Sequence, residues 1–236
     1  ERTALQLRRD LVEMIGAGKA GHLGGSASLA EIVAALYFHK MRFDPRSPRD
    51  PDRDRFILSK GHAVLIQYAA LTELGLLPRE ELKKTKTLQG LLQGHPDMAM
   101  TPGIEAVTGS LGQGLSIGLG MALALRLDGR RSRVYVIMGD GELSEGQIWE
   151  AAMAAWRFKA DNLVGILDKN GIQATGPTKD IFEIPYIVRK WEAFGWNVLS
   201  IDGHDPAAVV DALDAAEACE GRPTLIVANT VKGKGF

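Results

Sequence analysis

The chain has 236 residues, a length that allows one large domain or two small ones. Hydrophobic residues make up 45% of it and charged residues 24%, which is an ordinary composition for a globular domain. The formal net charge of −1 argues against a nucleic-acid arm or a membrane-surface patch as the main basis of function. A single cysteine, Cys219, excludes an internal disulfide, so we expect a cytoplasmic location.

Residues 106–125 form an uncharged run as long as a membrane span. Its many glycine, serine and threonine residues make it too polar for that role. No basic segment followed by an apolar stretch opens the chain, and its first residue is Glu1, so we expect some trimming of the amino terminus. We therefore expect no membrane partner and no nucleic-acid partner.

Strand and helix patterns alternate along most of the chain. Buried-strand patterns occur at residues 56–58, 134–138, 163–167, 197–201 and 224–228. Helical patterns cover residues 61–74, 115–127, 148–158, 186–194 and 205–219. Residues 44–55 and most of 76–106 have the composition of loops, and a loop as long as the second is usually functional.

Strand, helix and strand in succession imply a right-handed crossover and parallel strands. We therefore predict an α/β fold with a doubly wound, mostly parallel sheet flanked by helices. No linker divides the chain, so we expect a single domain over residues 1–236. In the helix between the second and third strands, the apolar face is predicted to hold Ile148, Ala152, Ala155, Trp156 and Phe158.

Hard oxygen ligands follow two strands of the predicted sheet. Asp140 comes directly after the strand at 134–138, and Asn170 follows the strand at 163–167. Parallel sheets bind ligands at the carboxyl ends of their strands, so these side chains could meet at one edge. A carboxylate and an amide oxygen suit Mg²⁺ bound together with phosphate oxygens. The alternative is that both are turn residues, because Asp and Asn are common in turns.

Three other groups of residues have weaker signals. A glycine cluster at 109–114 precedes a helix and could face an anion, although glycines that allow close helix packing are an equal alternative. His22, His62, His95 and His204 each follow a glycine and could shuttle protons in exposed loops. For His204, which lies beside a helix cap, we prefer a capping or solvated role. Acidic side chains near a helix start, such as Glu145 and Glu150, ordinarily complement the helix dipole.

The segment Gly139-Asp140-Gly141 followed by Asn170 resembles the signature of thiamine-diphosphate enzymes. Five motifs in the same order narrow the resemblance to transketolase. They are Gly21-His22-Leu23-Gly24-Gly25, Ser59-Lys60-Gly61-His62, Gly94-His95-Pro96, Thr108-Gly109-Ser110-Leu111-Gly112-Gln113-Gly114 and Gly139-Asp140-Gly141-Glu142-Leu143-Ser144-Glu145-Gly146. The chain is similar to the amino-terminal, diphosphate-binding half of a split transketolase.

The resemblance implies a role for each matching residue. Asp140, Asn170 and the carbonyl of Ile172 would hold Mg²⁺ on the diphosphate of thiamine diphosphate. Further cofactor contacts are implied for His62, Gly109, Leu111, Gly139 and Gly141. His22, His62 and His95 would face the substrate channel and move protons, and Glu145 and Glu150 would join two active sites across a dimer interface.

The resemblance also implies a partner. The pyrimidine-binding domain of the family, with its activating glutamate and its sugar-phosphate contacts, has no counterpart in these residues. We therefore expect the partner to be a carboxy-terminal transketolase subunit, the substrates to be sugar phosphates, and this chain alone to give no turnover. The alternatives are half of an enzyme like deoxyxylulose-phosphate synthase, and a non-catalytic cofactor-binding module. A nicotinamide dehydrogenase is disfavoured because the sequence has no proper dinucleotide fingerprint.

Overall fold

A five-stranded parallel sheet forms the centre of the fold in the computed structural model, which describes residues 1–16 and 21–236. The strands are β1 (Arg55–Leu58), β2 (Val134–Gly139), β3 (Leu163–Lys169), β4 (Asn197–Asp202) and β5 (Thr224–Asn229). Their order in the sheet is β1-β2-β3-β5-β4, and every neighbouring pair is parallel. The five predicted strands are confirmed, each longer than predicted by one or two residues.

Helices cover both faces of the sheet. The α-helices are α1 (Arg2–Ile15), α2 (Leu23–Ala27), α3 (Ala30–Ala35), α4 (Val64–Glu73), α5 (Gln113–Leu127), α6 (Gly146–Arg157), α7 (Thr178–Ile181), α8 (Ile187–Ala193) and α9 (Pro206–Ala218). Short turns of other helix types are η1 (Leu36–Lys40), η2 (Gly61–Ala63), η3 (Arg79–Lys84) and η4 (Gly141–Ser144). The doubly wound α/β fold is therefore confirmed.

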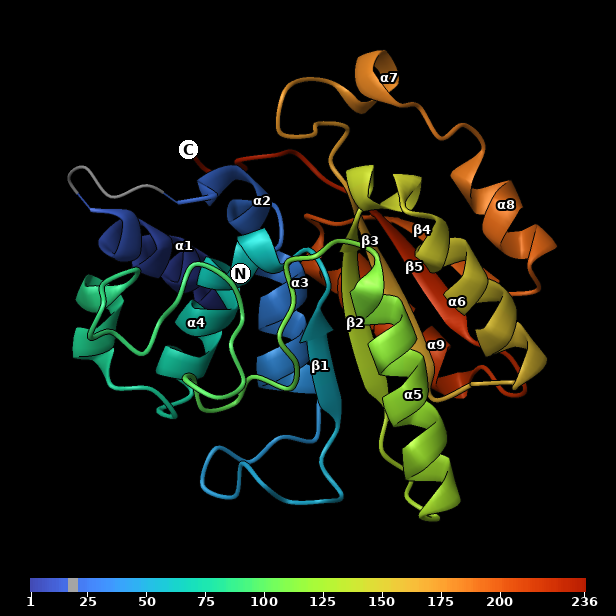
Figure 1. Ribbon diagram of the computed structural model, residues 1–236, viewed down its shortest axis with the longest axis horizontal. Helices are drawn as coiled ribbons and strands as arrows, with labels where there is room; N and C mark the ends of the chain where they lie inside the picture. Colours follow the sequence, from blue (N-terminus) through green and yellow to red (C-terminus); the bar gives the residue numbers. More distant parts are fainter. Residues whose placement is uncertain (17–20) are drawn as a thin grey trace.

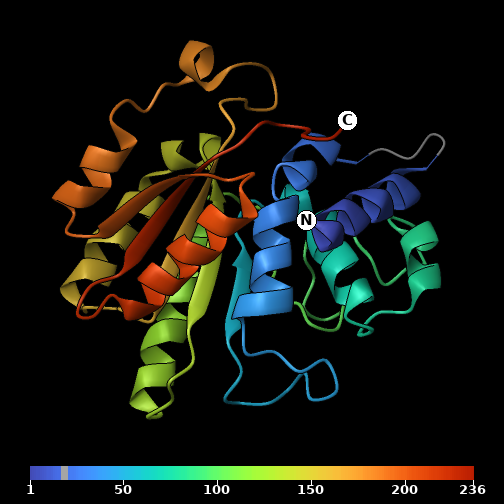
Figure 2. The same ribbon diagram turned by 180° about the vertical axis from the view of Figure 1, so that it is seen from behind.

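Alternate residues of each central strand enter two different apolar cores. Along β2, Val136 packs with α5, α6 and α8, whereas Tyr135 packs with α3, α4 and α9. This alternation follows from the two-residue period of a strand. Figure 1 shows α5 and α6 in front of the sheet, and Figure 2, the view from behind, shows α3 and α9 over the opposite face.

Two parts of the structure differ from the sequence-based expectation. Trp156 and Phe158 are about half exposed, although we expected them on the buried face of the helix that follows β2. The reason is geometric, because Ile148, Ala152 and Ala155 fill that face and Phe158 lies beyond the end of α6. The helices α1, α2, α3 and α7 are also additional to the predicted elements, although the buried side chains of α1 recur at helical spacing.

The sheet register brings several loop residues to one edge. Gly139 lies opposite Asp168, and Asp168 lies opposite Ala228, at the carboxyl ends of β2, β3 and β5. The residues that follow these strands therefore emerge side by side. Among the described residues, no helix is long and apolar enough to cross a membrane.

The packing of α5 on β2 gives a test of the fold. A Cβ atom at Gly118 would lie 2.4 Å from the Val136 side chain, whereas one at Gly120 would meet no atom within 4 Å. We expect Gly118→Ala to lower the free energy of unfolding by about 1–3 kcal/mol through overpacking. The control Gly120→Ala should raise it by about 0.5–1 kcal/mol because alanine favours the helix. Urea denaturation of both variants measures the difference, and equal effects would contradict this packing.

Candidate functional site

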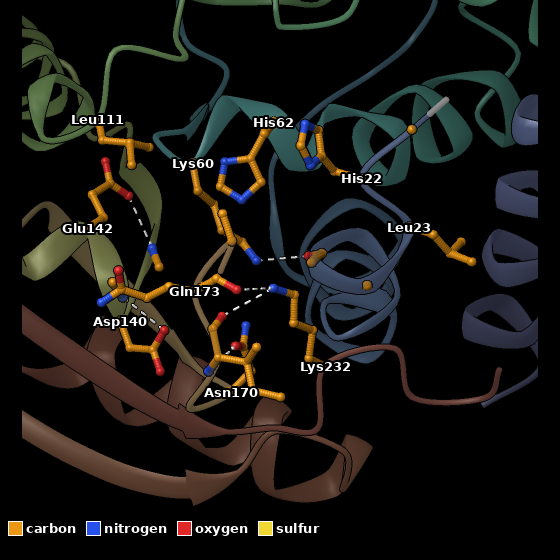
Figure 3. Close-up of a pocket in the computed structure, with 17 residues that line it drawn as sticks. His22, Leu23, Lys60, His62, Leu111, Asp140, Glu142, Asn170, Gln173 and Lys232 are labelled. Atoms are coloured by element: carbon orange, nitrogen blue, oxygen red, sulfur yellow. Dashed lines mark hydrogen bonds between the residues drawn. The ribbon is translucent and has the colours of Figure 1, made fainter. Parts of the chain in front are cut away.

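A cavity of about 510 Å³ opens at the carboxyl edge of the sheet. Its walls come from the start of α2, from the loops after β1, β2 and β3, and from the segment after β5 (Figure 3). The predicted site residues that line it are His22, His62, Leu111, Gly139, Asp140, Gly141, Asn170 and Ile172. Gly109, His95, Glu145 and Glu150 are not among its lining residues.

Asp140 is held rigidly at the end of β2. The two oxygens of its carboxylate accept hydrogen bonds from the backbone N–H groups of Gly141, at 2.9 Å, and Gly171, at 2.6 Å. Burial raises the pKa of Asp140, and the two backbone hydrogen bonds oppose that effect. The carboxylate thus lies at the cavity wall with limited access to water, which favours a bound cation over a solvated charge.

Asn170 and Ile172 lie on the loop after β3, beside Asp140. The Asn170 side chain donates to Asp168 Oδ2 at 2.9 Å, and its oxygen accepts from the backbone N–H of Ile172 at 3.1 Å. These two bonds fix which end of the amide is the oxygen and turn that oxygen away from Asp168. The carbonyl of Ile172 accepts from Lys232 Nζ at 3.2 Å.

These oxygens form a sparse set of cation ligands. No group of three or more His, Cys, Asp or Glu side chains that could hold a metal occurs among residues 1–16 and 21–236. One carboxylate, one amide oxygen and one carbonyl oxygen match the way Mg²⁺ binds, with water and phosphate oxygens completing its shell. The residues therefore fit a magnesium ion that arrives together with a diphosphate.

Asp168, at the carboxyl end of β3, is fully buried behind the cavity. Its carboxylate pairs with Lys60 and accepts hydrogen bonds from Ser28 Oγ at 2.7 Å, from Thr230 Oγ1 and from Asn170. Burial by itself would raise the pKa of this group, but Lys60 and the hydrogen bonds outweigh it and hold the pKa below its usual value. Asp168 is therefore charged at neutral pH and joins four segments of the chain.

Two lysines reach the cavity, and they differ in how their charges are balanced. Lys60 is buried, pairs with Asp168 and donates to the carbonyl of Gly25 at 2.8 Å. Lys232 donates to two carbonyls, those of Ile172 and of Gln173, the latter at 2.9 Å. Within the described residues Lys232 forms no ion pair, so its charge is available to an anion. Burial, followed by the charge of Lys60, lowers the pKa of Lys232.

His22 and His62 lie together on the side of the cavity opposite Asp140 and Asn170 (Figure 3). Their ring centroids are 5.2 Å apart with the edge of one ring toward the other. Burial, and then the charge of Lys60, lowers the pKa of His62 to about 4. Burial also lowers the pKa of His22. Both rings are therefore neutral at pH 7 and each offers one donor and one acceptor.

His95 is exposed and lies against the glycine-rich loop. Its backbone carbonyl accepts a hydrogen bond from the Tyr68 hydroxyl at 3.1 Å, and its ring packs against Gly109. Gly109 has a φ of 136°, and a Cβ atom there would lie 2.7 Å from the His95 ring. The glycine is needed at this position both for its backbone conformation and for this close approach.

Glu142 connects three of the motifs found in the sequence. It is buried, and its carboxylate accepts from Ser59 Oγ, from the backbone N–H of Gly112 at 2.8 Å and from that of Gly139 at 3.1 Å. Burial raises its pKa, with these hydrogen bonds opposing the rise. Glu142 thus holds the loops after β1 and β2 against the start of α5.

Glu145 and Glu150 are exposed and lie away from the cavity, at and near the start of α6. The Glu145 side chain packs against Gly112, where a Cβ atom would come within 2.7 Å of it. Glu145 makes no capping hydrogen bond to the described helix α6. Both carboxylates are therefore accessible to another chain.

Sequence reasoning missed several residues of the site. For Lys60 and Asp168 a signal existed, because each is a charged residue that adjoins an apolar strand pattern. Such a charge requires a buried partner. Gln173 and Lys232 carry no comparable local signal, since only the folded chain brings the segment after β5 onto the loop after β3.

Comparison with known proteins identifies the family. Residues 1–236 match the family described as transketolase, thiamine diphosphate binding domain. The chain is 46% identical to a 6-deoxy-6-sulfo-D-fructose transketolase subunit of Clostridium sp. (strain MSTE9), covering 97% of this chain and 83% of that protein. It is 42% identical to an apulose-4-phosphate transketolase subunit of Phocaeicola vulgatus, covering 97% of this chain and 81% of that protein.

A solved structure shows the same fold. The transketolase of Pichia stipitis in complex with sedoheptulose-7-phosphate superposes with a TM-score of 0.95 and 34% identity, covering 99% of this chain. The chain spans only 36% of the length of that transketolase. These matches show that the chain belongs to the transketolase family, as its thiamine diphosphate binding domain.

Proposed function

We propose that the chain binds Mg²⁺ and thiamine diphosphate in this cavity. Together with a second polypeptide, it transfers a two-carbon ketol unit from a ketose phosphate to an aldose phosphate. The observation that carries the proposal is that Asp140, Asn170 and the Ile172 carbonyl share one wall of the cavity, with Lys232 beside them. Family membership supports the same assignment.

The residues fit the diphosphate end of the cofactor. Asp140, Asn170 and the Ile172 carbonyl would hold the magnesium ion, and the ammonium of Lys232 would offset the remaining negative charge. Gly139 and Gly141 have no side chains, so backbone groups can approach the phosphates closely. When bound, the thiazolium ring of the cofactor supplies the carbanion chemistry.

The remaining residues orient the substrate and handle protons. The neutral rings of His22 and His62 can each donate a hydrogen bond to one substrate hydroxyl and accept a proton from another. His95, although it is not a lining residue, would extend this set toward the channel. Leu111 and the backbone of Gly109 would support the pyrimidine ring and exclude water from it.

The size of the relatives supports a split enzyme. Two relatives are named as transketolase subunits, and the chain spans 83% and 81% of their lengths. We infer a cytoplasmic assembly in which a carboxy-terminal subunit supplies the pyrimidine-binding domain. Self-association would occur through the exposed residues around Glu145 and Glu150. The names of these two relatives specify a sulfonated sugar and a sugar phosphate, both of which are anionic. A sulfonated sugar is therefore the alternative to a sugar phosphate as substrate.

The other functions have less support. An enzyme half like deoxyxylulose-phosphate synthase shares the general site and would differ in the donor that it accepts. A non-catalytic module has no need for an intact cavity with two neutral histidines and a lysine beside the proposed metal ligands. The family match gives no support to a nicotinamide dehydrogenase.

The magnesium assignment predicts a specific loss of binding. Asp140→Asn removes the one carboxylate of the proposed ligand set, so affinity for thiamine diphosphate in the presence of Mg²⁺ should fall at least about a hundredfold. Isothermal titration calorimetry of the assembled enzyme measures this. Asp211→Asn, on the exposed surface of α9, is the matched control and should bind normally. Normal binding by the Asp140 variant would refute the proposed site.

The split-enzyme proposal predicts activity that depends on a second polypeptide. We expect that the chain, purified from its host under mild conditions, brings with it a polypeptide containing the pyrimidine-binding domain. That complex should transfer a two-carbon unit when thiamine diphosphate and Mg²⁺ are present, and separation should abolish transfer. Turnover by the isolated chain would contradict the proposal. Transfer from a donor that is not a ketose would favour the synthase-like alternative.

The lowered pKa of His62 predicts a pH dependence of stability. The unfolded chain takes up a proton at this histidine below about pH 6.5, whereas the folded chain does so only near pH 4. The free energy of unfolding should therefore fall as pH falls through this window.

His62→Gln should make this fall shallower. Urea denaturation of the cofactor-free chain at several pH values gives the slope. His39→Gln, on the exposed end of η1, is the control and should keep the original slope. An unchanged slope in the His62 variant would show that folding does not lower the pKa of this imidazole.

A further inference from the structure

His204 lies outside the cavity, in the turn after β4, and both of its ring nitrogens are engaged. Its Nε2 accepts a hydrogen bond from the backbone N–H of Val231 at 2.8 Å. Its Nδ1 lies 3.1 Å from a carboxylate oxygen of Glu31. Because a backbone N–H can only donate, Nε2 must be the unprotonated nitrogen and the ring proton is on Nδ1. The His204 ring therefore accepts a hydrogen bond from Val231 and donates one to Glu31, so it links these two residues and is not a solvated side chain.

Glu31 fixes this bridge to the amino-terminal helices. Its carboxylate accepts two hydrogen bonds from the Arg8 guanidinium, at 2.6 and 2.8 Å, in addition to the one from His204. All three side chains are nearly buried, with exposures of 10–12%. Bidentate contacts of this kind are both strong and directional. The orientation of the His204 ring is thus set by α1 and α3.

The same cluster holds the segment after β5, residues 230–235, which we call the C-terminal strap. Arg8 Nε donates to the carbonyl of Lys234 at 2.8 Å, and the N–H of Gly233 donates to the carbonyl of Gly24 at 2.9 Å. The hydroxyl of Thr230 donates to Asp168. The strap runs from β5 to α2, as Figures 1 and 2 show from opposite sides.

Lys232 lies between the two strap residues that the cluster holds. Val231 before it is bound by His204, and Lys234 after it is bound by Arg8. Lys232 is the strap residue whose side chain lines the cavity, where it contacts the loop after β3 (Figure 3). If the strap lost its hydrogen bond to His204 and moved, the ammonium of Lys232 would move away from the carbonyls of that loop.

We propose that His204, oriented by Glu31 and Arg8, is a positioning residue that holds the C-terminal strap so that Lys232 stays in the cavity. The role of Lys232 toward the cofactor rests on the function proposed above, but the hold on the strap does not. His204 is not a lining residue of the cavity, so it acts on the site through the strap and Lys232.

Two amide substitutions separate the bonds of His204. In His204→Gln the side-chain oxygen reaches the position of Nε2 and can still accept from Val231. In His204→Asn the shorter amide reaches only the position of Nδ1, which keeps the link to Glu31 and loses the acceptor for Val231. Both replacements are neutral and polar, so they differ mainly in which bond they preserve.

Two measurements on the cofactor-free chain test the hold on the strap. In His204→Asn, amide hydrogen exchange at Val231 should accelerate roughly fivefold to tenfold, the equivalent of one lost hydrogen bond. Acetylation of Lys232, followed by mass spectrometry with the exposed Lys234 as internal reference, should accelerate as well. His204→Gln should remain close to the parent in both, and unchanged exchange in β3 shows that each variant is folded. Unchanged exchange and labelling in His204→Asn would overturn the proposal.

A double-mutant comparison tests whether His204 acts through Lys232. Affinity of the assembled enzyme for thiamine diphosphate and Mg²⁺ should fall in His204→Asn and in Lys232→Met, and the double variant should bind no more weakly than Lys232→Met alone. Additive losses would overturn the positioning role. If the parent enzyme binds no cofactor, the proposed function fails, and the exchange and labelling results still decide the role of the strap.

Discussion

The site depends on the buried ion pair between Asp168 and Lys60. The Asp168 carboxylate binds the loop after β1 through Lys60, the end of α2 through Ser28, the loop after β3 through Asn170 and the C-terminal strap through Thr230. Removing one partner of a buried pair typically costs about 3–5 kcal/mol, because the other charge is left uncompensated. An apolar pair of equal volume could hold the core, but it could not orient four polar segments at once.

This pair also determines which charges the cavity offers. Lys60 is paired with the Asp168 carboxylate, whereas Lys232, among the described residues, donates only to backbone carbonyls of the loop after β3. Burial and these two lysines disfavour a charge on His62, which leaves its ring neutral. The cavity therefore has a charged side, where Lys232 lies near Asp140 and Asn170, and an uncharged, hydrogen-bonding side at the histidines. A ligand with a charged end and a hydroxylated end would be oriented by this difference.

The parts of this arrangement that could be predicted are those with a local pattern. The run 134–138 predicts a strand from its apolar residues alone, and Asp140 and Asn170 follow from their position after parallel strands. Lys232 could not be placed, because its contacts lie with Ile172 and Gln173, about sixty residues earlier in the chain. For His204 the sequence favours a capping or solvated role, because it gives no sign of Glu31 or Val231 beside it. The positions of Lys232 and His204 depend on tertiary contacts, which no local sequence pattern indicates.

The outer surface of α5 and α6 connects the site with the proposed assembly. These helices pack together, and their N-cap residues, Gly112 and Glu145, lie against each other. Exposed apolar side chains on these helices include Leu127, at the end of α5, and Met153 on α6. Gly112, next to Leu111 in the glycine-rich loop, packs against Glu145 and donates its N–H to Glu142. A chain that bound at Glu145 would therefore affect the position of this loop. The cofactor site and the proposed dimer contact would thereby share one short segment of backbone.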